Sequence, residues 1–129
     1  MSGRTRWLIL VSVGAAAAFL RPFRVEVAGS SMEPTLRPGD WLIATRAGAI
    51  GRGRVVVLRH PEDSMDLVKR VSAIPGDVVD GRTLGPDEYL VEGDNSDAST
   101  DGRSFGTVAR VAIEGVVRVR YSPRFGVVR

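Results

Sequence analysis

The chain has no cysteine, a single histidine and a single lysine among its 129 residues. Without cysteine it can form no disulfide, no thiolate zinc site and no thiol nucleophile. One histidine is too few for a histidine-rich metal cluster, so we expect no metal and no other cofactor. The apolar share of 43% fits a folded core, and the length fits one domain with an appendage.

Positive charge comes almost entirely from arginine, and the formal net charge is +3. A basic balance is typical of proteins that bind nucleic acid, but the arginines are scattered along the chain. The sequence also has neither a helix-turn-helix pattern nor an aromatic RNA-binding motif. We therefore expect no nucleic-acid partner. Attraction to a lipid bilayer fits the chain better, because its N-terminus is apolar.

An uncharged run of fourteen residues lies between Arg6 and Arg21. As a helix it would span about 21 Å, short of the ~30 Å hydrocarbon core unless the flanking arginines snorkel and the helix extends to Phe23. One interpretation is an uncleaved anchor over residues 1–23. The other is a secretory signal peptide with a small-residue cleavage site at 15–18. We favour the anchor, which would make the protein single-pass in the cell membrane.

The rest of the sequence consists of short β-rich runs separated by turn residues. Valine, isoleucine and tyrosine fill the runs, while glycine, proline, aspartate and asparagine separate them. The expected strands lie within 23–29, 40–46, 53–60, 66–74, 76–81, 88–95 and 111–121. The pattern predicts an all-β, antiparallel domain over residues 24–129, with a linker at residues 21–23.

The only lysine, Lys69, lies in the β-rich run DLVKRV. In a strand its side chain shares a face with Leu67 and Val71, while Val68 and Arg70 face the other way. A buried lysine can lose its proton and an arginine cannot, so a site that needs a neutral amine requires lysine. The alternative is a lysine whose stem lies on apolar surface while its charge stays in water.

The stretch GSSMEPTLRPGD offers a candidate nucleophile. Ser30 and Glu33 fit the capping box of a helix start. Pro34 disfavours that interpretation, because the residue before a proline is pushed out of the α region. We expect instead a strand that ends at Val27, followed by a Gly-Ser-Ser turn that presents a hydroxyl beside a backbone N–H.

A serine nucleophile needs a base. His60 is one candidate, but it stands directly before Pro61 and no acidic partner is evident, which disfavours a serine–histidine–aspartate triad. Lys69 is the other candidate.

The polar loop GDNSDASTDGR has interpretations of its own. Asp97, Ser99 and Asp101 copy ligand positions of a calcium loop, but Val108 stands where the bidentate glutamate belongs. We therefore expect no metal here. A turn rich in side-chain-to-backbone hydrogen bonds is the simpler alternative.

Three segments together resemble the type I signal peptidases, the serine–lysine proteases that remove signal peptides from exported proteins. SMEPTLRPGD from Ser31, VKRVSAIPGD from Val68 and GDNSDASTDGRSFG from Gly93 are similar, in order, to the serine, lysine and C-terminal boxes of that family. With the strands between them they cover nearly everything from Val25 to Tyr121. Larger members insert a second β-domain before the last box. The short segment here leaves no room for it, so the resemblance implies a minimal, single-domain form.

The resemblance implies roles residue by residue. Ser31 matches the nucleophile and Lys69 the general base, whose pKa would be lowered by desolvation. Ser99 matches a serine that orients the lysine, and the Ser31 N–H would be one oxyanion donor. Gly29 stands where many members carry a serine as second donor, and Ser30 is a candidate substitute. The remaining assignments are structural support at Asp94, Asn95, Asp101 and Arg103, and substrate contacts at Val25, Val27, Met32 and Pro34.

The function that the resemblance implies is a membrane-anchored serine endopeptidase that removes signal peptides from precursors with Ala-x-Ala-like sites. We expect its catalytic domain on the extracytoplasmic side. A dedicated maturation protease for one partner is an alternative, as is a self-cleaving repressor-type protease, although the sequence has no DNA-binding region. A further alternative is a catalytically silent domain that binds peptides or lipid. Two departures from the family pattern would favour it: Gly29, and Gly102, which replaces the family's usual serine between Asp101 and Arg103. Val25 and Val27 also have a second interpretation, as core residues only.

Overall fold

The structure is a computed structural model that describes residues 21–46, 48–59, 66–95 and 106–129. Most of the predicted N-terminal anchor therefore lies outside the described residues. Within the described ranges, no helix has the length and apolar character needed to cross a membrane.

The described residues are almost entirely strands and turns. The strands are β1 Pro22–Glu26, β2 Trp41–Thr45, β3 Val55–Arg59, β4 Asp66–Ala73, β5 Val78–Val79, β6 Arg82–Thr83, β7 Tyr89–Glu92, β8 Thr107–Val108, β9 Ile113–Ser122 and β10 Gly126–Val127, with a short 3₁₀ helix at Arg110–Ala112. Each of the seven β-rich runs of the sequence contains or overlaps a strand. The prediction of an all-β, antiparallel domain is confirmed.

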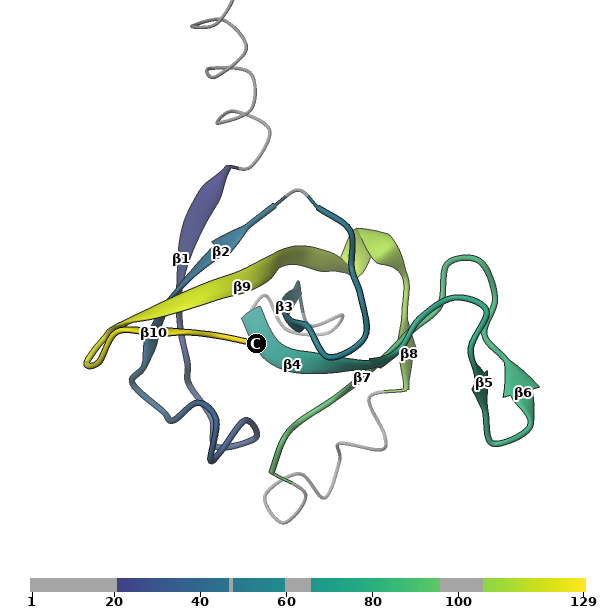
Figure 1. The fold of residues 1–129 in the computed structure, drawn as a ribbon, viewed down its shortest axis with the longest axis horizontal. Helices are drawn as coiled ribbons and strands as arrows, with labels where there is room; N and C mark the ends of the chain where they lie inside the picture. The colour runs from purple at the N-terminus through teal and green to yellow at the C-terminus, as the bar shows by residue number, and fades with distance from the viewer. Residues whose placement is uncertain (1–20, 47, 60–65, 96–105) are drawn as a thin grey trace, which may run out of the picture.

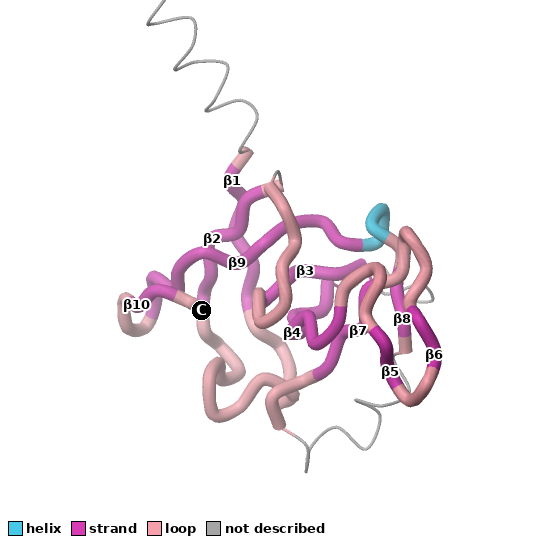
Figure 2. Tube along the Cα trace, turned by 45° about the vertical axis from the view of Figure 1, so that its right-hand side comes forward, coloured by secondary structure: helices cyan, strands magenta, loops and turns pink. Residues whose placement is uncertain are grey.

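The strands form one large sheet and one small hairpin (Figure 1). The large sheet has the order β1-β2-β9-β3-β4-β7-β8, with β10 pairing to β9, and its pairs are antiparallel. The long strand β9 joins its two halves, because it pairs with β2 and with β3. The hairpin of β5 and β6 projects on the side opposite β1 in both views (Figures 1 and 2).

Two apolar clusters form the core. The first core cluster contains Val25, Val27, Met32, Leu36, Leu42, Ala44, Val55, Val57, Val68, Val117 and Val128. The second core cluster contains Ile50, Val56, Leu58, Val71, Val91, Ile113 and Val116. Alternate residues of β3 enter different clusters, so this strand is buried on both faces. That burial explains its continuous run of aliphatic residues where a half-exposed strand would alternate.

The linker expected at residues 21–23 is shorter than the sequence predicted, because β1 begins at Pro22. Phe23 pairs with Ala44 on β2 and packs against the first core cluster. A Cβ added to Gly115 would lie 2.6 Å from the Phe23 ring, so the glycine on β9 makes room for the aromatic side chain. The Arg46 guanidinium covers the ring at 4.3 Å from its centroid. These contacts fix the start of β1 on the sheet.

Candidate active site

The loop between β1 and β2, which we call the serine loop (residues 27–40), is closed at its base by the backbone. The Val27 N–H donates to the Asp40 carbonyl at 2.9 Å, and the Gly39 N–H donates to the Val27 carbonyl at 2.8 Å. Gly39 has φ 90°, a conformation that favours glycine. The Asp40 carboxylate accepts a further bond from the Arg37 N–H at 2.9 Å. The loop therefore leaves the sheet from a fixed base.

Within the serine loop the backbone forms turns where a capping box would have begun a helix. The Glu33 N–H donates to the Ser30 carbonyl, and the Leu36 N–H donates to the Met32 carbonyl. Met32 and Leu36 are buried in the first core cluster, at 1% and 0% exposure. These two side chains anchor the loop and leave Ser31 half-buried between them and solvent. The prediction of a turn in place of a helix start is confirmed, although β1 ends at Glu26, one residue before the predicted Val27.

Lys69 lies in the middle of β4 and is only 8% exposed. Val71 and Leu67 pack in the second core cluster while Val68 packs in the first, so the predicted alternation along this strand is confirmed. Burial lowers the pKa of the Lys69 ammonium, because desolvation penalises its charged form. Met32 packs in the first core cluster, on the other face of β4 from Leu67 and Val71.

Gly93 connects the serine loop to this lysine. Arg70 on β4 pairs with Glu92 on β7, and one further step in an antiparallel register brings Gly93 across from Lys69. A Cβ added to Gly93 would lie 2.6 Å from the Ser31 carbonyl oxygen and 3.2 Å from the Ser31 Cβ. Only glycine allows this approach. The strand register and the close packing therefore bring the Ser31 backbone to the strand position beside Lys69.

Asn95 holds the serine loop from the same side. Its backbone N–H donates to the Ser31 carbonyl at 2.8 Å, and its Nδ2 donates to the Ser30 carbonyl at 3.1 Å. The two bonds fix consecutive carbonyls, which sets the direction of the peptide that carries the candidate nucleophile. Figures 1 and 2 show the serine loop and the segment after β7 at the same end of the molecule. Among the residues that the structure describes, no backbone carbonyl accepts a hydrogen bond from the Ser31 N–H.

Asp94 is the centre of a polar brace. Arg70 donates two bonds to the Asp94 carboxylate, both 2.8 Å long, and Thr35 Oγ1 donates a third at 2.7 Å. The Arg70 Nη1 also donates to the carbonyls of Gly53 and Arg129. The brace thus ties the serine loop to β4 through one carboxylate. Sequence reasoning assigned Asp94 to structural support but missed Arg70 and Thr35. The signal for Arg70 was its place on the face of β4 opposite Lys69.

The Asp94 brace predicts an acid-sensitive contribution to stability. Hydrogen bonds from Arg70 lower the pKa of Asp94, with Thr35 adding to the effect. The stabilisation is therefore present above the carboxyl's unfolded pKa and is lost as the pH falls through its lower folded value. We expect Asp94→Asn to lower the free energy of unfolding at neutral pH by about 1–3 kcal/mol. Thermal unfolding at neutral and acidic pH measures this.

The matched control for this prediction is Asp80→Asn, which removes an exposed carboxylate outside the brace. Wild type and Asp94→Asn should become similar in stability at acidic pH, whereas the control should follow wild type throughout. An Asp94→Asn variant as stable as wild type at neutral pH would contradict the role of the brace.

Three of the four predicted substrate contacts are buried in the core. Val25 and Val27 are buried in the first core cluster, at 6% and 4% exposure, which agrees with their interpretation as core residues. Met32 is buried as well, so its side chain offers no substrate contact at the surface. Pro34 and Gly29 are exposed, and a Cβ added to Gly29 would meet no atom within 4 Å.

Other predicted residues lie outside the described part of the chain. They are Ser99, Asp101 and Arg103 of the polar loop, and the alternative base His60. Among the residues described, no group of three or more histidine, aspartate or glutamate side chains is placed to hold a metal ion.

The buried lysine, the braced serine loop and the antiparallel sheet define a candidate serine–lysine hydrolase. Residues 4–84 and 79–122 match the family described as signal peptidase, peptidase S26. The two ranges include the serine loop, β4 and β7. The chain therefore belongs to the peptidase S26 signal peptidase family.

Named relatives support the same assignment. The chain is 34% identical over 110 residues to mitochondrial inner membrane protease subunit 1 of Xenopus tropicalis, an alignment that covers 74% of this chain and 66% of the relative. It therefore spans just under two thirds of that protein. It is 26% identical over 172 residues to signal peptidase IB of Staphylococcus aureus strain Mu50, covering 91% of this chain and 88% of the relative. The second alignment is longer than the chain, so the relative contains segments that have no counterpart here.

Proposed function

We propose that the protein is a serine endopeptidase in which Ser31 is the nucleophile and Lys69 the general base. The observation that carries this proposal is the burial of the only lysine at a strand position beside Gly93, against which Ser31 packs. Membership of the signal peptidase family supports signal-peptide cleavage as the reaction. The substrates would be exported precursors with small residues, such as Ala-x-Ala, before the cleavage site.

The chemistry follows from the lowered pKa of Lys69. A neutral Lys69 amine accepts the Ser31 hydroxyl proton while Oγ attacks the scissile carbonyl carbon. The Ser31 N–H stabilises the oxyanion that forms, and the Lys69 ammonium returns the proton to the leaving amine. Water, deprotonated by the same amine, then hydrolyses the acyl-enzyme ester and releases Ser31. Each step leaves Lys69 in the protonation state that the next step requires.

The position of β1 supports binding of an extended substrate. β1 is the end strand of the large sheet in the described part of the chain, with β2 on its one paired edge. A precursor segment can add to such an edge through backbone hydrogen bonds. Because Val25 and Val27 are buried, recognition along β1 would use the backbone more than these side chains. An N-terminal anchor over residues 1–23 would hold the domain at the extracytoplasmic surface of the membrane, where precursors emerge.

The test is cleavage of a precursor that carries an Ala-x-Ala signal peptide by the full chain in detergent. We expect a single cut after the last small residue, identified by sequencing the new N-terminus. Ser31→Ala should remove the activity without changing thermal unfolding, because Ser31 is half-buried and its substitution adds no volume. A folded wild-type protein that cuts no precursor would favour the silent peptide-binding domain instead.

A dedicated maturation protease is a second candidate. The Staphylococcus relative contains segments that this chain lacks, so the present domain has less surface for recognising varied substrates. Comparing cleavage rates for several unrelated precursors distinguishes the two functions. Similar rates indicate a general signal peptidase, and one strongly preferred precursor indicates a dedicated protease.

A serine introduced at Gly29 is expected to increase the rate of cleavage. In many members of the resembled family a serine side chain at this position donates to the oxyanion, and the chain has space for one here. We expect Gly29→Ser to raise kcat by about tenfold or more, because a second donor would stabilise the transition state. Gly29→Ala is the matched control, since it fills the same space without a hydroxyl. Equal rates for the serine and alanine variants would contradict an incomplete oxyanion hole.

A further inference from the structure

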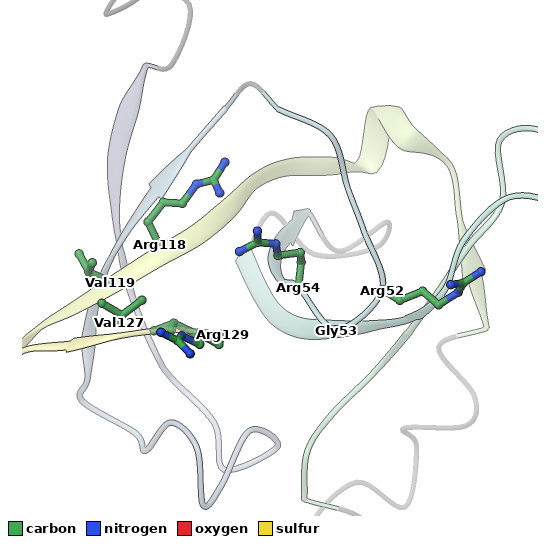
Figure 3. A pocket seen from close by; sticks show the side chains of 8 residues that line it. Arg52, Gly53, Arg54, Arg118, Val119, Val127 and Arg129 are labelled. Atoms are coloured by element: carbon green, nitrogen blue, oxygen red, sulfur yellow. The ribbon is translucent and has the colours of Figure 1, made fainter.

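The structure has a pocket whose lining includes neither Ser31 nor Lys69. Its volume is about 610 Å³, and it lies beside β9 and β10 (Figure 3). Its lining consists of Arg52, Gly53, Arg54, Arg118, Val119, Val127, Val128 and Arg129. We call it the arginine pocket. Half of its lining residues carry a guanidinium group, and the others are valines and one glycine.

The charges of the arginine pocket are only partly compensated. Arg52 forms a bidentate ion pair with Asp77, and Figure 3 shows its guanidinium pointing away from the other three. Arg118 donates its Nε–H to the neutral Thr45 hydroxyl at 3.0 Å. Within the described ranges, no carboxylate side chain forms a salt bridge with the three remaining arginines, which are Arg54, Arg118 and Arg129. A concave surface with three such cations concentrates positive potential.

The walls of the arginine pocket are held by backbone bonds. The Val128 N–H donates to the Arg118 carbonyl at 3.0 Å, which fixes the C-terminal segment against β9. The Gly53 N–H donates to the Val71 carbonyl, and Arg70 donates to the carbonyls of both Gly53 and Arg129. The positions of the guanidinium stems are therefore set by the fold.

We propose that the arginine pocket binds a phosphate group. A carboxylate has two oxygens, which one guanidinium can satisfy, whereas a phosphate offers enough oxygens for guanidinium groups from several directions. Arg54, Arg118 and Arg129 come from three separate segments that line the same pocket, which fits a phosphate better than a carboxylate. Val119 and Val127 add an apolar wall that suits a ligand with a hydrocarbon part. A free phosphate and the headgroup of a phospholipid share this chemistry.

The proposal is tested by isothermal titration calorimetry of the full chain in neutral detergent micelles at constant ionic strength. One titrant is inorganic phosphate and the other is short-chain phosphatidylglycerol. Saturable binding of inorganic phosphate identifies a free anion as the ligand. Binding of phosphatidylglycerol alone identifies the lipid headgroup. If neither titrant binds, the proposal is overturned.

Variants show whether binding occurs in the arginine pocket. We expect Arg54→Gln/Arg118→Gln to weaken binding by at least about tenfold, because two charge-assisted donors are lost. The matched control, Arg24→Gln/Arg124→Gln, removes the same charge from exposed positions outside the pocket and should bind as wild type does. Equal weakening in both variants would mean that net charge alone attracts the anion, which overturns the proposal.

Arg118 also donates a hydrogen bond to Thr45 on β2, so Arg54→Gln/Arg118→Gln could weaken binding through a folding defect. A further variant tests this. Arg54→Gln/Arg129→Gln changes only exposed side chains of the pocket and should leave the thermal unfolding midpoint unchanged. It should weaken phosphate binding to a similar degree. Unweakened binding by this stable variant would contradict the assignment of the site. Ser31→Ala should bind phosphate normally, which separates this proposal from the proposed peptidase activity.

Discussion

Lys69→Arg is expected to lower kcat/KM for precursor cleavage by about two to four orders of magnitude, the usual contribution of a general base. Arginine retains the positive charge and most of the length of lysine, but its guanidinium does not lose a proton in proteins. The variant therefore separates the charge of the side chain from its ability to act as a base. The measurement is steady-state cleavage of the Ala-x-Ala precursor.

The control for Lys69→Arg must exclude a folding defect, since the wild-type side chain is only 8% exposed. Lys69→Met removes the charge and keeps an unbranched chain of similar length, so it should be as inactive as Lys69→Arg, and thermal unfolding checks that both variants are folded. Arg24→Lys, on the exposed face of β1, makes the reverse exchange away from the site and should leave the rate unchanged. A folded Lys69→Arg protein with a rate near wild type would show that another group is the base.

The pH dependence of kcat/KM is a second test of Lys69 as the general base. Burial lowers the pKa of Lys69 from its usual 10.5, and only the neutral amine can accept the Ser31 proton. The kcat/KM of wild type should therefore rise with pH through that lowered pKa and level off above it. Residual cleavage by Lys69→Arg should lack this rise. A profile without a rising limb in wild type would contradict a titrating lysine base.

The strands of this fold could be predicted from the sequence because their side chains are nearly all β-branched or aliphatic between turn residues. The two-residue strands β6, β8 and β10 were missed, since they are too short to show an alternating pattern. Pairing with β5, β7 and β9 makes them strands. That pairing depends on tertiary structure.

Some residues of the candidate site could likewise be predicted from the sequence, and others could not. The single lysine and its apolar strand neighbours made Lys69 a candidate from local sequence, and the resemblance to the signal peptidases assigned it the role of general base. The brace around Asp94 could not be read locally, because its partners Arg70 and Thr35 are 24 and 59 residues away. The arginine pocket was missed for the same reason, since its cations come from separate segments that only the folded sheet brings together.

Gly93 shows most directly how the fold positions the candidate nucleophile. It directly follows Glu92, which pairs with Arg70 next to Lys69, and it packs against the Ser31 backbone. The neighbouring Asn95 holds the Ser31 carbonyl at 2.8 Å, so the serine loop cannot retreat from Gly93 without breaking that bond. The absence of a side chain at this one position therefore determines how close the serine can come to β4.

Gly93→Ala is accordingly expected to lower the proposed peptidase activity strongly while the sheet stays folded. Its Cβ would lie 2.6 Å from the Ser31 carbonyl oxygen, a backbone atom that cannot rotate away. A displacement of Ser31 by about 1 Å would lower kcat/KM by about a hundredfold. Gly51→Ala is the matched control, because its Cβ would meet no atom within 4 Å. Full activity in a folded Gly93→Ala protein would mean that Ser31 reaches its substrate without this contact, and that the geometry beside Lys69 does not control the reaction.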